Sequence, residues 1–292
     1  LLVIPQGVLT YLPIEMLYPD GSSPTFMLDR FAVSYASSAS LLWEQTQMEV
    51  SGDAFAGFNA DYSGYGSLPP LMGSLKEIES ISAIFGPSSD VFVNATADDF
   101  RQAAPGYKVL HLALHSFIDD EKPLFSRLVF TGSAKGQSEI TANELYAMDL
   151  NADLAVLSAC ETGIGQLHRG EGMMSLSRAF MYAGVPSTLF SLWKVPDQAT
   201  SRLMTKFYTF LEKGQSRDVA LSNAKREFVR DYPEMSAPLF WAGFVINGKT
   251  DPLTLGRSFF SKALIMGVVL IVLAVVTTIY VSRRNRSKQV VL

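Results

Sequence analysis

The chain has 292 residues, of which 48% are hydrophobic and 18% charged, so it can bury a substantial core and does not resemble a disordered protein. The formal net charge is −4, and the basic residues that follow Gly256 leave the preceding part more acidic still, which argues against a nucleic-acid partner. A single cysteine, Cys160, excludes an intrachain disulfide framework and any multi-cysteine zinc site.

The sequence opens inside an apolar run, with no initiator methionine and no charged signal region before it. We therefore expect it to be the C-terminal part of a longer protein. Along the chain, apolar runs of strand length alternate with segments of helical periodicity, which predicts a mostly parallel sheet covered by helices on both faces. The expected strands are 1–5, 31–35, 54–59, 91–93, the runs that end at His115 and Cys160, 126–131, 187–193 and 241–246. The expected helices are 74–85, 98–104, 141–147, one that follows Gly172, 200–213 and 217–231.

Two helix starts carry capping signals. Ser74 and Glu77 have the spacing of a capping box, and Thr96 precedes the expected helix at 98–104 as its N-cap.

Two of the strand-like runs end in residues that can carry chemistry. One run ends at His115 and the other at Cys160. In open α/β sheets, functional sites lie beyond the carboxyl ends of the strands. A thiolate nucleophile needs an imidazole beside it to take and return a proton, so this pair predicts a cysteine hydrolase. The backbone amides of Cys160 and Ser116 are the candidate donors to an oxyanion.

Other residues near these strand ends have more than one interpretation. His111 lies inside the strand, where it either supports His115 or is a satisfied core histidine. A metal site of these two histidines lacks a third ligand in a metal motif, so we expect no metal and no cofactor. Asp197 leaves the next strand at the same edge, where it could bind a basic side chain of a peptide or cap the following helix. Trp193 could form an apolar wall of such a pocket, and Glu161 could help to shape it.

The C-terminal part predicts a membrane anchor. Residues 263–281 form an uncharged apolar segment of about 19 residues, enough to cross a bilayer, and a basic tail follows. The excess of positive charge after the span favours a cytoplasmic tail and an exoplasmic or periplasmic domain, with a cytosolic tail-anchored arrangement as the alternative. We expect a domain at 1–250, a linker at 251–262, a transmembrane helix at 263–281 and a basic tail at 282–292.

The chain resembles the CHAT domain, a caspase-like peptidase domain often found behind tetratricopeptide repeats in bacteria. The resemblance rests on VLHLALHS, LSACETGIG, RGEGMMSLSRAF, LFSLWKVPDQAT and PLFWAGFVINGK, and it runs over about 1–248. It implies the caspase–separase fold, a three-layer sandwich with His115 and Cys160 as the catalytic dyad. Ser116 departs from the glycine that usually follows the histidine in this clan. The separase relatives carry a similar Leu-Trp followed by an aspartate that receives a basic P1 side chain, which favours the pocket role of Asp197.

Together these observations predict a membrane-tethered cysteine endopeptidase that cleaves a protein or peptide after a basic residue. Upstream repeats and a protein partner would regulate it. The alternative is a membrane-anchored interaction scaffold whose CHAT domain is dormant or inactive.

Overall fold

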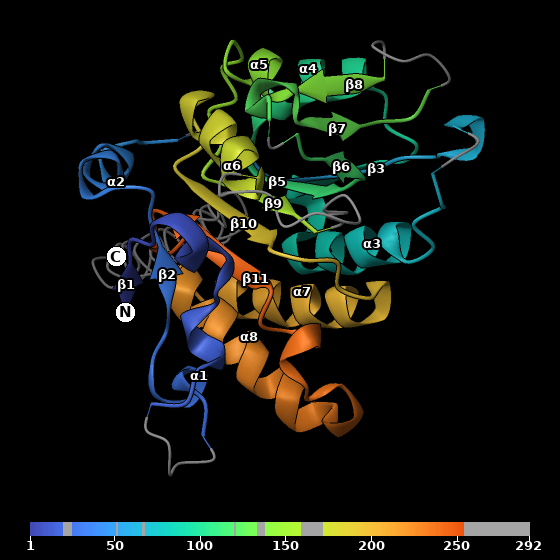
Figure 1. Cartoon of the computed structure of the whole chain (residues 1–292). Coiled ribbons are helices and arrows are strands. Elements are labelled where there is room, and N and C mark those ends of the chain that lie inside the picture. The colour runs from blue at the N-terminus through green and yellow to red at the C-terminus, as the bar shows by residue number, and fades with distance from the viewer. Residues whose placement is uncertain are drawn as a thin grey trace, which may run out of the picture. The chain divides into compact units, whose positions relative to one another are not determined.

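The computed structural model describes residues 1–19, 25–50, 52–65, 68–119, 121–132, 138–158 and 172–253, which belong to one compact unit, Leu1–Thr254. Within these ranges, eight strands form one sheet in the order β1-β2-β11-β10-β9-β5-β3-β4 (Figure 1). Neighbouring strands are parallel except β10 and β11. In spatial order their bounds are Leu2–Val3, Ser34–Tyr35, Phe244–Gly248, Ser187–Ser191, Leu154–Leu157, Tyr107–Ala113, Asp53–Asn59 and Ser89–Phe92.

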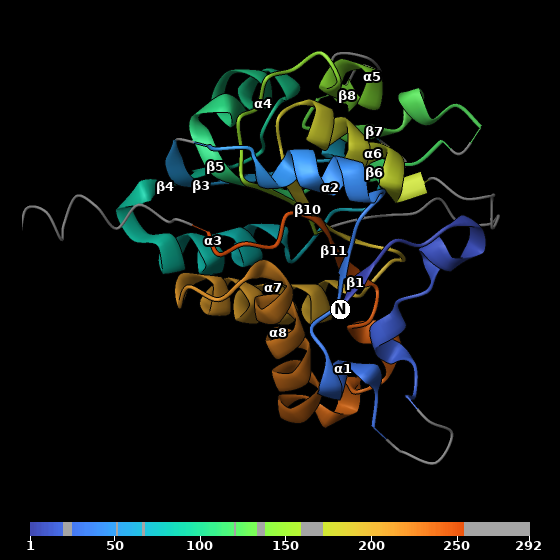
Figure 2. The same cartoon turned by 90° about the vertical axis from the view of Figure 1, so that its left-hand side faces the viewer.

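Helices cover both faces of the sheet, as the alternating pattern predicted (Figures 1 and 2). One face carries α3 (Ser74–Phe85), α7 (Asp197–Glu212) and α8 (Arg217–Asp231), with the short α1 (Met27–Arg30) beside α8. The other face carries α4 (Ala97–Ala103), α5 (Ala142–Leu145) and α6 (Gly172–Tyr182). Helix α2 (Ala39–Thr46) follows β2. A small antiparallel sheet of β6 (Ser116–Phe117), β7 (Arg127–Val129) and β8 (Glu139–Thr141) begins directly after β5.

Strand β5 shows how the two faces are used. Leu110 and Leu112 are buried in the main apolar cluster, whereas His111 between them faces α3 and α7. Successive side chains of a strand point to opposite faces, so this alternation follows from the sequence. Helix α3 packs closely on β3, because a Cβ at Gly57 would lie 2.2 Å from Cγ2 of Ile78. Glycine at position 57 therefore allows the close approach of α3 to the sheet.

A buried ionic cluster attaches the N-terminal segment to α8. The Lys225 ammonium donates to Oε1 of Glu15 at 2.6 Å, and the Tyr35 hydroxyl donates to Oε2 of the same carboxylate at 2.6 Å. All three side chains are buried. Burial lowers the pKa of Lys225, whereas burial and then the charge of Glu15 raise the pKa of Tyr35. We call these three residues the Glu15 cluster.

Several local expectations need correction. Ser74 is the first residue of α3 rather than its cap, and its hydroxyl donates to the Leu71 carbonyl. The predicted capping box with Glu77 is therefore wrong, whereas the Thr96 cap of α4 is confirmed as a full capping box with Asp99. The strand expected at 126–131 is shorter, because β7 spans Arg127–Val129, and it lies in the middle of the small sheet.

The element bounds near the C-terminal part of the domain also differ from expectation. The helix expected from residue 200 begins earlier, at Asp197. The last strand begins at Phe244 rather than 241, because Trp241 lies in a turn.

No helix within the described ranges is long and apolar enough to cross a membrane. The span expected at 263–281 lies outside those ranges.

Candidate active site

His115 lies just beyond the carboxyl end of β5, in the short connection to β6. Its side chain is fully buried, and Nε2 lies 2.8 Å from the backbone carbonyl oxygen of Pro69. A carbonyl oxygen can only accept, so this hydrogen bond places the proton of a neutral imidazole on Nε2. Nδ1 is then the nitrogen with a lone pair, which is the form that a general base requires.

Tyr62 fixes the backbone and the ring of His115. Its hydroxyl accepts a hydrogen bond from the His115 amide at 2.8 Å and donates to the Val129 carbonyl at 2.9 Å. The two rings lie against each other, with centroids 4.5 Å apart. The histidine is therefore held from two sides, by Pro69 through the ring nitrogen and by Tyr62 through the backbone.

The backbone amide of Ser116 points away from the small sheet. The Val129 amide donates to the His115 carbonyl, so Ser116 and Leu128 form a non-hydrogen-bonded pair of the antiparallel ladder. In such a pair the amide faces outward from the partner strand. This orientation makes the Ser116 N–H available as a donor beside His115.

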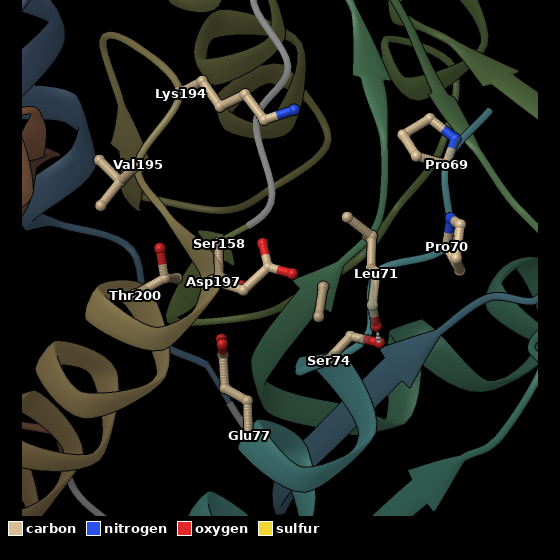
Figure 3. Close-up of a pocket in the computed structure, with 11 residues that line it drawn as sticks. Pro69, Pro70, Leu71, Ser74, Glu77, Ser158, Lys194, Val195, Asp197 and Thr200 are labelled. Atoms are coloured by element: carbon tan, nitrogen blue, oxygen red, sulfur yellow. Dashed lines mark hydrogen bonds between the residues drawn. The ribbon is translucent and has the colours of Figure 1, made fainter.

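A pocket enclosing about 180 Å³ lies at the carboxyl ends of β5, β9 and β10 (Figure 3). Its walls come from the segment before α3, from the ends of these strands, and from the first turns of α3 and α7. The residues lining it are Pro69, Pro70, Leu71, Ser74, Glu77, Ala113, Ser158, Lys194, Val195, Asp197 and Thr200. Pro69 thus borders the pocket with its ring while its carbonyl orients His115.

Asp197 contributes its carboxylate to this pocket. It is the first residue of α7, and the N-cap position belongs to Pro196, which makes no side-chain capping bond. The capping interpretation of Asp197 is therefore wrong. In Figure 3 its side chain extends from α7 into the pocket. Its position near the helix N-terminus also favours a negative charge there.

His111 belongs to a second, buried group below the pocket. Its Nε2 lies 2.8 Å from Oε1 of Glu77, and its Nδ1 lies 3.0 Å from the Tyr208 hydroxyl. Burial, and then the charge of Glu77, raise the pKa of Tyr208 well above its ordinary value, so the hydroxyl keeps its proton. Tyr208 can then donate to Nδ1, and His111 can donate its Nε2 proton to Glu77. His111 is thus a core histidine with a hydrogen-bond partner at each ring nitrogen.

Of the other predicted site residues, the structure describes Trp193 but not Cys160 or Glu161. Cys160 and Glu161 lie outside the described residues, and Cys160 comes two positions after Ser158, which lines the pocket. Trp193 packs against Gly243 and donates from Nε1 to the Leu239 carbonyl at 2.9 Å. Trp193 directly precedes Lys194 of the pocket, and its role as an apolar wall remains a prediction. Among the described residues no group of three or more ligating side chains could hold a metal ion.

Sequence reasoning did not find three residues that build this site. Pro69 acts through a backbone atom, for which residue type gives no signal. Tyr62 lies in a glycine- and serine-rich segment that has no strand or helix pattern to indicate burial. Glu77 was assigned to a capping box, although its place on the inward face of a predicted helix could have indicated burial.

Comparison with known proteins shows the family and the fold of the chain. The model of the CHAT domain matches residues 1–249. The chain belongs to the CHAT family. This CHAT domain is 32% identical over 125 residues to mouse tetratricopeptide repeat protein 28, and 31% identical over 125 residues to the human protein of that name. Each match covers 43% of this chain but only 5% of the relative.

The fold is also that of a solved cysteine proteinase. The CHAT domain superposes on gingipain R of Porphyromonas gingivalis, described as an Arg-specific cysteine proteinase, with a TM-score of 0.51 and 10% identity. The superposition covers 82% of this chain and 58% of that one. At this identity the likeness concerns the fold alone.

Proposed function

We propose that this chain is a membrane-tethered cysteine endopeptidase with His115 as its general base and Cys160 as its nucleophile. The observation that carries the proposal is the hydrogen bond from His115 Nε2 to the Pro69 carbonyl, which orients the ring and leaves Nδ1 as the basic nitrogen. Strand β9 lies beside β5 in parallel, and Cys160 follows three positions after its last residue. This topology supports the proposal, because the carboxyl ends of β5 and β9 lie at one edge of the sheet.

The proposed reaction proceeds through an acyl-enzyme. His115 takes the proton of the Cys160 thiol, and the thiolate attacks the peptide carbonyl carbon. The amides of Ser116 and Cys160 donate to the resulting oxyanion. The imidazolium then returns the proton to the leaving amine, the C–N bond breaks, and water activated by His115 hydrolyses the thioester.

We further propose that the pocket binds a basic P1 side chain. Asp197 supports this proposal, because a carboxylate at the pocket wall can form a charge-assisted hydrogen bond with a guanidinium or ammonium group. The surrounding apolar groups, including Pro70, Leu71 and Val195, suit the methylenes of arginine or lysine. Glu161 and Trp193 are proposed to border the same substrate cleft.

The membrane tether and the regulation of the enzyme are also proposals. The uncharged apolar segment at 263–281 and the basic residues after it support a single-pass anchor. The similarity to proteins named for tetratricopeptide repeats supports control by repeats or by a partner protein bound to them.

The decisive experiment measures cleavage of fluorogenic peptides by the purified full chain and by Cys160→Ala and His115→Ala. We expect both variants to lose turnover by about three orders of magnitude or more, because each removes a member of the dyad. Glu79→Gln, on the exposed side of α3, is the control and should keep the rate. Circular dichroism verifies that each variant keeps its fold. Unchanged turnover in Cys160→Ala would refute the mechanism, whereas an unaltered chain that cleaves none of the peptides would favour the scaffold alternative.

A second arm tests the P1 preference. Peptides that differ only in the P1 residue, with arginine, lysine, glutamate or leucine, are compared by kcat/KM. The proposal expects arginine and lysine to be preferred, and a preference for acidic or apolar P1 residues would overturn it. Asp197→Asn should reduce the preference for the basic peptides without abolishing cleavage of the others.

A further inference from the structure

Glu77 is a buried residue whose carboxylate also borders the pocket. Only 4% of its surface is exposed, yet it is among the residues that line the pocket. Of its two oxygens, Oε1 receives the hydrogen bond from His111 at 2.8 Å. Within the part of the chain that the structure describes, the other oxygen accepts no hydrogen bond. A buried carboxylate is stable only when its charge is compensated, and a single hydrogen bond from one imidazole compensates it incompletely.

Two side chains below the pocket, His111 and Tyr208, hold this carboxylate in place. Tyr208 and His111 are fully buried, and their hydrogen bonds run in series toward Glu77. Helix α3 is fixed on the sheet by the contact of Ile78 with Gly57, one residue after Glu77. The carboxylate is thus preorganised at the pocket, into which the Glu77 side chain points in Figure 3.

We propose that Glu77 is a second specificity-determining carboxylate of the pocket and that it binds the cationic end of the P1 side chain together with Asp197. The two groups come from different helices, α3 and α7, and both point into the pocket (Figure 3). A guanidinium has five N–H donors in a planar fork, so it can serve two carboxylates at once, whereas an ammonium is a compact point charge. The pocket therefore discriminates in favour of arginine over lysine.

Lys194 is the cation already present at the rim of the pocket. Its side chain is exposed, so water screens its charge more than it screens the charge of the buried Glu77. Lys194 therefore does not neutralise Glu77 in the way that a cation bound at the bottom of the pocket would. Among the described residues that line the pocket, Glu77 and Asp197 carry carboxylates and Lys194 carries an ammonium, so the summed charge of these residues is negative.

The inference rests on the proposed function in one respect, that this pocket receives the P1 side chain. Its test therefore measures binding rather than cleavage. The full chain with Cys160→Ala, which prevents turnover, is titrated with Nα-acetyl-arginine amide and with its neutral isostere Nα-acetyl-citrulline amide. The readout is the ratio of the two affinities, which does not depend on the fraction of correctly folded protein.

Glu77→Gln keeps the size of the side chain and an acceptor for His111 but removes the charge. We expect it to lower the arginine-to-citrulline ratio about tenfold or more, the effect of losing one charge-assisted hydrogen bond. Glu79→Gln, two positions along the same helix and exposed, is the matched control and should leave the ratio unchanged. Glu77→Asp keeps the charge on a side chain that is one methylene shorter, so it should give an intermediate ratio. This variant provides the test if the glutamine variant folds poorly.

The outcomes separate the two proposals. If Asp197→Asn lowers the ratio and Glu77→Gln does not, the role of Glu77 is refuted and the basic P1 pocket stands. If the unaltered pocket binds arginine and citrulline amides equally, the basic preference itself is refuted, and the role of Glu77 with it.

Discussion

The Glu15 cluster provides the sharpest stability prediction. Glu15→Ala removes the only carboxylate that the described structure places at the fully buried ammonium of Lys225. It also removes the acceptor of the buried Tyr35 hydroxyl. Breaking one side of a buried ion pair in other proteins lowers the free energy of unfolding by about 3–5 kcal/mol, because the remaining charge is uncompensated. We expect a loss of that size here.

The expected loss translates into a large thermal shift. For a domain of this size, each kcal/mol moves the unfolding midpoint by about 2–4 °C, so Glu15→Ala should lower it by roughly 6–20 °C. The pH dependence gives a second signature. Burial lowers the folded-state pKa of Lys225 below its ordinary 10.5, so the unfolded chain binds this proton more tightly. Stability must then rise with pH between the two pKa values, and more steeply in Glu15→Ala than in the parent.

The assay is thermal unfolding of the full chain, in mild detergent, between neutral pH and about pH 10. Asp231→Ala is the control, since it breaks the exposed ion pair with Lys206 and should shift the midpoint far less. The double variant Glu15→Leu with Lys225→Met removes both charges and should recover much of the loss. A Glu15→Ala midpoint no lower than that of Asp231→Ala would refute the reasoning.

Three further predictions follow from particular contacts. Gly57→Ala forces a methyl group against Ile78 and should lower the free energy of unfolding by about 1–3 kcal/mol, and an unchanged denaturation midpoint would show that α3 is not tightly seated. Hydrogen bonds at the α4 cap hold the pKa of Asp99 below its ordinary 3.8, so its stabilisation is present above that pH and is lost as pH falls through the folded pKa. Asp99→Asn should therefore be less stable than the parent at about pH 5, and the difference in free energy of unfolding should shrink as the pH falls to about 3. A difference that stays the same over this pH range would contradict the prediction. Tyr62→Phe removes the acceptor of the His115 amide and should destabilise the chain by about 1–3 kcal/mol by denaturant unfolding, with a lower rate of peptide cleavage. An unchanged denaturation midpoint would exclude this role of the hydroxyl.

The sheet architecture was predictable because its signal is local and repeated. Each buried parallel strand is a short apolar run, and the helices between them have a clear period, so the order of elements indicated the mostly parallel, helix-flanked sheet. The position of His115 at a strand end followed from the same pattern. The polarity of β11, which is antiparallel to β10, has no local signature, because the apolar pattern of a strand does not encode its direction.

The errors at the site have a common physical origin. Ser74 and Glu77 carry the spacing of a capping box, and a local pattern cannot tell whether the glutamate turns back to the helix or inward to a histidine 34 positions later. The Pro69 carbonyl orients His115 across 46 positions and is a backbone atom. Such partners are decided by tertiary packing, which sequence propensity does not contain.

The pairing of Tyr35 with Asn247 has a consequence for how the domain folds during synthesis. Among the described strands, β1 and β2 pair with each other and reach the rest of the sheet through β11, so a segment near the start of the domain depends on one near its end. Contacts of such separation form late, because the chain must close a long loop before they contribute. A ribosome-bound chain could complete β3, β5 and β9 while β1 and β2 were still detached from them and the Glu15 cluster was incomplete. Synthesis of β11 would then coincide with the closing of the domain, so the nascent domain reaches its full stability only after this strand has been made.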